Sequence, residues 1–215
     1  SLFLYQTAAL ALVRSGEADA VSDDFAWRAL ADAEAWRERL AALTPGCADT
    51  AWSLVVEDPA QPAFLQPPIH RGSLDPYKLA GTTPDELDVL VTAKAHDVKP
   101  ARAANPAPHD WVFALTNLQT MQGYSGRGNF GIARMNGGFS SRPMFMLTPA
   151  ADPGACFRRG VEAALAARSA ALEREGGYYR DDGLAVLWLD PWDDDTPLAL
   201  ADLDPLFVEV CRRIR

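Results

Sequence analysis

The chain has 215 residues, of which 48% are hydrophobic, and a formal net charge of −9. This composition supports a packed core and excludes an intrinsically disordered chain. No apolar run approaches the roughly 18 residues needed to span a bilayer. The three cysteines, Cys47, Cys156 and Cys211, are far apart and form no C-x-x-C pair, which predicts free thiols in a cytoplasmic protein without a structural zinc site.

The first part of the chain is predicted to be helical. The stretch Leu2–Leu12 is apolar and helix-like but has no N-cap ahead of it, so we expect the natural protein to extend before it. Asp23 or Asp24 can cap the next element, in which helical spacing runs from Phe25 to Leu43 and ends at a Pro-Gly pair. Trp52–Val56 follows as a strand candidate.

The rest of the chain alternates predicted helices with short strands. Helices are expected to start at Thr83-Pro84-Asp85-Glu86, to run from Trp111 to about Gln122 behind an Asp110 cap, and to span Phe157–Glu175. Strands are expected over Asn129–Met135, Arg142–Leu147 and Leu184–Leu189, the first two as an Asn-Gly-Gly hairpin, with a final helix or strand over Asp202–Arg215. The predicted class is α+β, mostly helical with short antiparallel strands, in a single domain over residues 1–215.

Charge is unevenly distributed. Between Thr92 and Phe145 six Lys and Arg residues face two Asp residues, a formal charge of +4, so the remaining residues carry −13. An acidic protein is a poor free-standing nucleic-acid binder, whereas one basic segment in an acidic body indicates a confined surface for anions. Ordinary scatter of surface charge is the alternative reading.

The basic segment contains four closely spaced glycines, Gly123, Gly126, Gly128 and Gly131. Glycine lets backbone N–H groups come close to phosphates or base edges. Arg127, Arg134 and Arg142 are interleaved with the aromatic residues Tyr124, Phe130 and Phe139, a mixture that suits base stacking beside phosphate contacts. The alternative is a glycine-terminated helix that leads into a hairpin.

A second candidate is the predicted loop that carries Lys94, His96, Asp97 and Lys99, with His109 and Asp110 beyond it. Two His-Asp pairs are compatible with a metal-dependent phosphohydrolase, because both side chains can bind metals. However, both pairs lie on or beside a proline-rich loop that would not fix ligand geometry, and Asp110 is explained as a helix cap. A loop that presents its lysines and histidine to phosphate is the favoured reading.

In chain order, several segments resemble the N-terminal domain of CasA, the large subunit of the type I-E CRISPR complex Cascade, in a divergent form. The resemblance covers about Leu2 to Leu147, and its segments are Ala8–Leu12, Phe64–Gln66, Leu87–Asp97, Leu115–Thr120, Gly123–Gly131 and Arg134–Gly138. The family also has a lysine finger, a wedge hairpin and a C-terminal four-helix bundle, which this chain lacks. We therefore expect a piece of the family's protein, truncated at both ends.

The resemblance implies a non-catalytic, nucleic-acid-binding subunit without a cofactor or a metal. Its implied partners are CRISPR RNA, target double-stranded DNA, the other Cascade subunits and the helicase-nuclease of the system, with no membrane. The loop with Lys94, His96, Asp97 and Lys99 would contact the RNA 5′ handle and the region of the protospacer-adjacent motif. Gly123, Gly126 and Gly128 would meet that motif from the minor groove, with Arg127, Arg134 and Arg142 as supporting charges. A protein-interaction scaffold, in which the glycines are only turns, is the remaining alternative.

Overall fold

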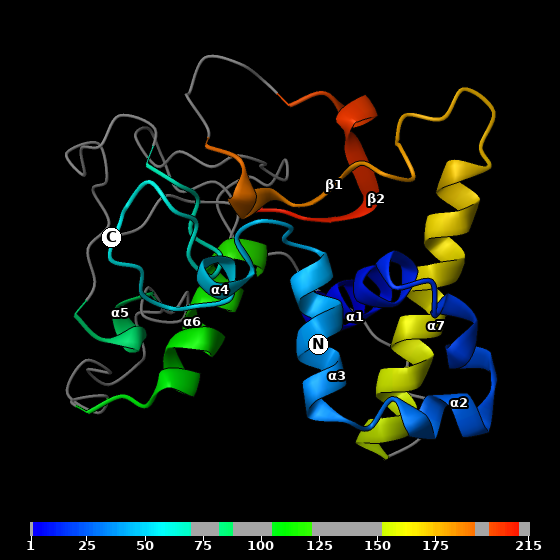
Figure 1. Ribbon diagram of the computed structural model, residues 1–215, viewed down its shortest axis with the longest axis horizontal. Helices are drawn as coiled ribbons and strands as arrows, with labels where there is room; N and C mark the ends of the chain where they lie inside the picture. The colour runs from blue at the N-terminus through cyan, green and yellow to red at the C-terminus, as the bar shows by residue number, and fades with distance from the viewer. Residues whose placement is uncertain (1, 70–81, 88–104, 122–151, 192–197, 211–215) are drawn as a thin grey trace, which may run out of the picture. The chain divides into compact units, whose positions relative to one another are not determined.

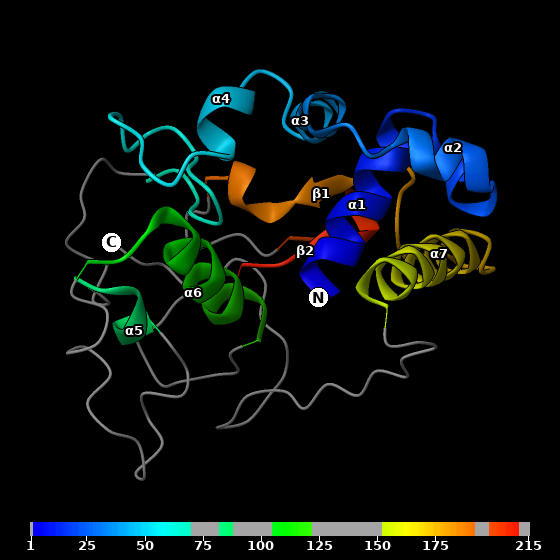
Figure 2. The same ribbon diagram turned by 90° about the horizontal axis from the view of Figure 1, so that it is seen from below.

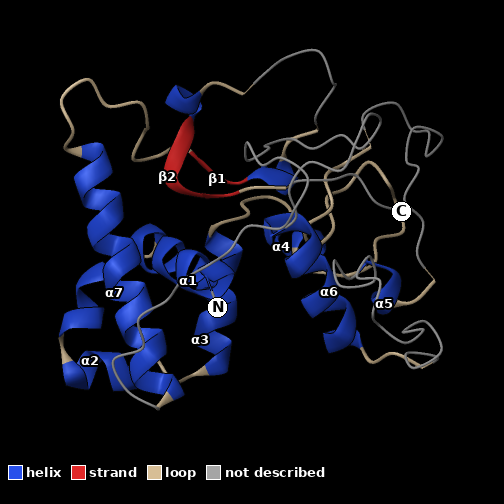
Figure 3. Ribbon diagram, turned by 180° about the vertical axis from the view of Figure 1, so that it is seen from behind, coloured by secondary structure: helices blue, strands red, loops and turns tan. Residues whose placement is uncertain are grey.

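The computed structural model describes residues 2–69, 82–87, 105–121, 152–191 and 198–210. The chain divides into two compact units, each described here by itself. The first unit comprises Ser1–Ala48, Phe145–Val186 and Leu198–Val208, and the second comprises Asp49–Met144, Leu187–Pro197 and Glu209–Arg215. Helices predominate among the described residues (Figure 3), as the sequence predicts. The single-domain organisation stays a prediction.

Helices α1 (Leu2–Arg14), α3 (Ala33–Ala42) and α7 (Pro153–Leu172) form most of the first unit. Helix α1 lies between α3 and α7 (Figure 2) and also contacts strand β2 (Leu203–Val208). Every residue from Thr7 to Leu12 is buried. Burial of this stretch on all sides explains why every residue over 8–12 is alanine or leucine.

Helix ends in the first unit follow from short polar residues and glycine. The Asp23 carboxylate accepts a hydrogen bond from the Ala26 N–H, 2.7 Å away, and begins α2 (Asp24–Ala29). Asp152 caps α7 in the same way, and Asp32 caps α3. Because Asp32 starts a new helix, the predicted continuous element over 25–43 is wrong: it is two helices.

Gly16 ends α1 through a backbone conformation that favours glycine. Its φ is +74°, and its N–H donates to the Val13 carbonyl while the Glu17 N–H donates to that of Leu12. This paired arrangement satisfies carbonyls that the helix end would otherwise leave open. The chain then continues into the 3₁₀-helix η1 (Ala18–Ser22), which contacts both α1 and α7.

The two described strands, β1 (Leu184–Val186) and β2, pair in parallel (Figure 1). The prediction of antiparallel strands is therefore wrong for this sheet, and the predicted hairpin over 129–147 lies outside the described residues. Parallel strands require a long crossover, which residues 187–202 supply. Strand β1 is also shorter than predicted, because Leu187–Leu189 turns into a 3₁₀-helix, η4.

The second unit contains α4 (Ala48–Ala51, which begins at the last residue of the first unit), α5 (Pro84–Leu87) and α6 (Pro108–Met121). Its core includes an aromatic cluster of Trp52, Phe64 and Trp188, in which Trp188 is fully buried and packs edge-on against Trp52 with ring centroids 5.5 Å apart. The Trp188 indole N–H donates to the Ala51 carbonyl, 3.0 Å away. The predicted strand over 52–56 is wrong, because these residues form turns and loop after α4.

Candidate functional site

Most residues of the predicted nucleic-acid surface lie outside the described residues. They are Lys94, His96, Asp97, Lys99, Gly123, Gly126, Arg127, Gly128, Arg134 and Arg142. The structure does describe the helix between the two predicted loops, α6, and the pair His109 and Asp110 at its start. Of the candidate surface, the structure therefore describes α6 and the residues at its start.

His109 and Asp110 lie in the first turn of α6 and point to solvent. Their side chains are 72% and 48% exposed, with 3.6 Å between His109 Nε2 and an Asp110 carboxylate oxygen. The other carboxylate oxygen accepts the Ala107 N–H at 2.9 Å. The prediction of Asp110 as the N-cap before Trp111 is therefore wrong: α6 begins at Pro108, and Asp110, its third residue, reaches back to the residue before the helix. Among the described residues no three His, Cys, Asp or Glu side chains gather as a metal site would need.

Helix α6 is anchored by one apolar face and one buried amide. Ala114, Leu115 and Leu118 are buried, and Gln119 is fully buried beside them. The Gln119 side-chain amide donates to the Leu65 carbonyl, 2.9 Å away. A buried amide needs such a partner, because an unpaired one costs about 1–3 kcal/mol. The bond fixes the last turns of α6 against the 63–66 segment.

The segment that receives Gln119 is a tight turn with an unusual backbone. Ala63 and Gln66 exchange backbone hydrogen bonds of 3.0 and 2.9 Å, and Leu65 between them has φ +56°. A left-handed conformation is uncommon for leucine. Leu65 is nevertheless fully buried, so apolar burial and the Gln119 bond hold the turn in place.

The first unit contains an ionic cluster that the sequence analysis missed, with Arg168 and Asp204 buried at its centre, Arg14 partly buried and Asp181 largely exposed. The Asp204 side chain is completely buried, and that of Arg168 on α7 is only 7% exposed, with 2.7 Å between Arg168 Nη2 and an Asp204 oxygen. Arg168 Nε donates to both Asp204 oxygens, at 3.2 and 3.0 Å. This two-pronged contact is the geometry in which arginine binds carboxylate best.

The remaining members complete the cluster. Arg14 donates to Asp204 at 3.4 Å and to the Gly183 carbonyl at 2.8 Å, and Arg168 also donates to the Asp181 carboxylate at 2.6 Å. Burial alone would lower the pKa of Arg168, but its hydrogen bonds to Asp204 and Asp181 outweigh burial and raise it. The Arg168 guanidinium therefore stays charged, and the cluster ties α1, α7 and β2 together.

One sequence signal could have indicated this cluster. Asp204 is an acid inside the otherwise apolar run from Leu203 to Val208, and a buried acid requires a cationic partner. Nothing local distinguishes Arg168 from the half-buried Arg158 and the exposed Arg159 of the same helix.

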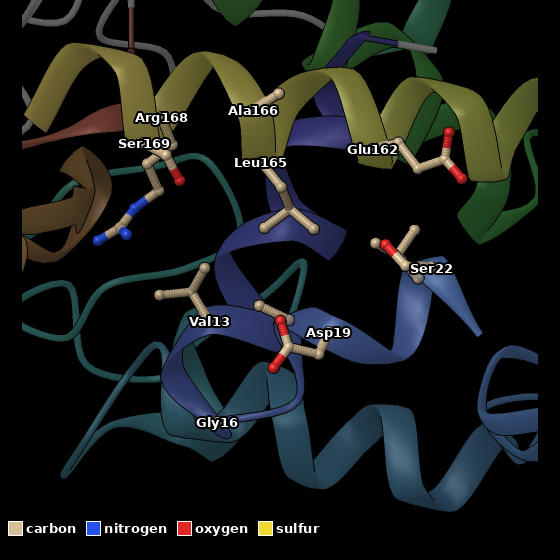
Figure 4. Close-up of a pocket in the computed structure, with 11 residues that line it drawn as sticks. Val13, Gly16, Asp19, Ser22, Glu162, Leu165, Ala166, Arg168 and Ser169 are labelled. Atoms are coloured by element: carbon tan, nitrogen blue, oxygen red, sulfur yellow. The ribbon is translucent and has the colours of Figure 1, made fainter. Parts of the chain in front are cut away.

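A cleft of about 460 Å³ opens in the first unit between the end of α1, η1 and α7 (Figure 4). Leu165 points into it from α7, and Val13 and Asp19 face it from the opposite wall (Figure 4). Ser22, Glu162 and Ser169 lie at its edge, whereas Arg168 directs its guanidinium away towards the ionic cluster. The volume lies within the range of sites for small molecules.

Two negative findings complete the description. None of the helices in the described ranges combines the length and the apolar character that crossing a membrane demands. No protein-family model, curated protein or solved structure matches the chain.

Proposed function

We propose that this chain is a nucleic-acid-contacting part of the large subunit of a type I-E Cascade complex, acting in the cytoplasm without catalytic residues of its own. In this proposal Lys94 and Lys99 neutralise phosphate, and His96 and Asp97 contact the CRISPR RNA handle. The backbone at Gly123, Gly126 and Gly128 meets the protospacer-adjacent motif of the DNA.

The observation that carries the proposal is a contact between two segments of the resemblance. Phe64–Gln66 and Leu115–Thr120 are far apart in sequence, yet Gln119 of the second donates its buried amide to Leu65 of the first, at 2.9 Å. Chance matches have no reason to share a core. Segments that belong to one inherited core are expected to pack together.

Covalent geometry supports a shared role for the two predicted loops. Lys99 precedes Pro108, the first residue of α6, by nine residues, and Gly123 follows Met121, the last one, by two. Helix α6 is about 20 Å long, and nine extended residues reach about 30 Å. Both stretches can therefore contact one nucleic acid from a helix that Gln119 anchors.

The charge distribution supports the same reading. The segment from Thr92 to Phe145 carries +4 in a chain of −9, so phosphate would be attracted to this segment and repelled elsewhere. The metal-dependent phosphohydrolase reading gains nothing from the described pair, because Asp110 serves the start of α6 and His109 is largely exposed.

The test is DNA binding by a complex reconstituted from this protein without substitutions (the parent), guide RNA and the other Cascade subunits. The variants are compared with the parent in the same complex. Lys99→Glu should weaken binding to all DNA sequences and make its salt dependence shallower, because one phosphate contact is lost. Gly126→Asp should instead weaken binding selectively when the motif is present, because a side chain and a negative charge would obstruct the backbone. Fluorescence anisotropy across a salt series measures both effects.

The matched control is Arg37→Glu, which changes charge by the same amount at a side chain 75% exposed on α3. It should leave affinity and salt slope unchanged. Equal salt slopes for Lys99→Glu and the parent would contradict the phosphate role. Failure of the parent protein to co-purify with guide RNA and any Cascade subunit would reject the proposed function and leave the scaffold reading.

A further inference from the structure

The cleft of the first unit is built by three segments whose positions are set by other contacts. Gly16 turns the chain at the end of α1 with φ +74°, and Arg158 of α7 holds η1 by donating to the Val21 carbonyl at 2.7 Å. Val13, Val21 and Leu165 form the apolar part of the wall of this cleft, and the exposed Asp19 belongs to its polar part. It is thus a feature of the fold and independent of the predicted nucleic-acid surface.

The charges that line the cleft leave one carboxylate uncompensated. Glu162 accepts from Arg159 at 3.1 Å and lies 3.6 Å from Arg158. Arg168 is occupied by Asp204 and Asp181. Within the described part of the chain, Asp19 makes no hydrogen bond or ion pair through its carboxylate. The cleft therefore presents a single free negative charge beside an apolar wall.

We propose that this cleft binds a small aliphatic ammonium compound, with the ammonium group on Asp19 and the hydrocarbon chain against Leu165 and Val13. Opposite charge and apolar burial both favour such a ligand, in the way that lysine side chains combine an aliphatic stem with a charged end. An anion would be repelled by Asp19, and a neutral alcohol would lack the ion pair.

The experiment titrates the full chain with butylammonium and follows backbone amide resonances by NMR. Saturable shifts at Gly16, Asp19 and Ser169 are expected, with a Kd of the order of millimolar for so small a ligand. Butanol and butyrate, which share the hydrocarbon chain, should bind up to about fivefold more weakly, the effect of one exposed ion pair.

Two variants locate the ligand. Asp19→Asn should weaken butylammonium binding by up to about fivefold, and Ala166→Phe, which adds a ring at an exposed residue of the lining, should block it. The matched control Asp49→Asn removes the same charge from an exposed position in the second unit and should bind like the parent. Equal binding in Asp19→Asn or Ala166→Phe, equal binding of butanol, or no saturable shift in the parent would overturn the proposal.

Discussion

The two units stabilise their cores by different physics. In the first unit the ionic cluster places the fully buried Asp204 against Arg168 and Arg14. In the second unit the aromatic cluster places the fully buried Trp188 against Trp52 and Phe64, with a single hydrogen bond to the Ala51 carbonyl. The ionic cluster holds together only if every charge is paired. The aromatic cluster depends mainly on area and shape, which are less sensitive to any one polar partner.

This difference matters for how each unit responds to change. Removal of one member of a buried ion pair strands the other charge in a medium that solvates it poorly, whereas removal of both can be almost neutral. Replacement of an aromatic ring loses contacts roughly in proportion to the volume removed. The predictions below test this contrast.

The largest effect is expected for Arg168→Met. The substitution leaves the Asp204 carboxylate buried without its main partner and should lower the free energy of unfolding by about 3–5 kcal/mol. Urea denaturation followed by far-UV circular dichroism measures the loss.

The control for this variant is Arg159→Met, at a side chain 68% exposed on the same helix, which should cost under about 0.5 kcal/mol. The double variant Arg168→Met/Asp204→Leu should recover part of the loss, because the charges that then lose a partner, Arg14 and Asp181, have side chains 24% and 80% exposed and are reached by solvent. A loss below about 1 kcal/mol for the single variant would show that the cluster is not what holds α7 to β2.

A smaller effect is expected for Trp188→Phe in the second unit. The change keeps an aromatic ring but removes the indole N–H, so the Ala51 carbonyl loses its donor and the core loses volume. We expect a loss of about 1–3 kcal/mol, measured by urea denaturation with tryptophan fluorescence as the probe. The control Trp36→Phe concerns a half-buried ring on α3 and should cost less; equal losses would mean that the indole hydrogen bond contributes nothing.

The smallest effect on stability is expected for Glu17, where hydrogen bonds and burial act on the pKa in opposite directions. Hydrogen bonds from Arg39 and then Ser15 lower the pKa of Glu17 from 4.5 to about 2, against the opposing effect of burial. Glu17 therefore adds stability that is fully present above pH 4.5 and is lost as the pH falls towards 2. Because its side chain is 39% exposed, solvent screens the pair and the contribution should be only about 1 kcal/mol.

Unfolding measured between pH 6 and pH 2 checks this expectation with Glu17→Gln. The variant should be less stable than the parent near neutral pH and equal to it near pH 2. Glu34→Gln, at an exposed pair on α3 with a side chain 68% exposed, is the control and should differ little from the parent at any pH. A constant difference for Glu17→Gln over the whole range would place the effect in packing and not in ionisation.

Much of the helical structure could be predicted from the sequence. The α1 stretch, the Asp23 cap and the helix start at Pro84 follow from apolar composition and local capping residues. The two main errors in the predicted elements have different causes, one local and one distant in sequence. Asp32 divides the predicted helix over 25–43 because its carboxylate accepts the Glu34 N–H, and the turns after α4 replaced a strand because Trp52 packs on Phe64 and Trp188.

The candidate sites divide in the same way. The basic and glycine-rich segment between Thr92 and Phe145 is visible in composition alone, and its role stays a prediction. The cleft beside Asp19 could not be predicted, because its walls come from residues around 13–22 and 162–169 that meet only in the fold. The bond between Gln119 and Leu65 likewise joins residues 54 positions apart.

By itself, the sequence determined that the described chain is mostly helical and located some helix ends, such as those at Asp23 and Pro84, because capping hydrogen bonds act over a few residues. Only the tertiary structure decided the parallel pairing of β1 with β2 and the burial of Arg168 on Asp204. Both depend on partners that are distant along the chain. The contribution of a charged side chain or a strand edge to stability depends on what packs against it, and no local sequence pattern specifies that partner.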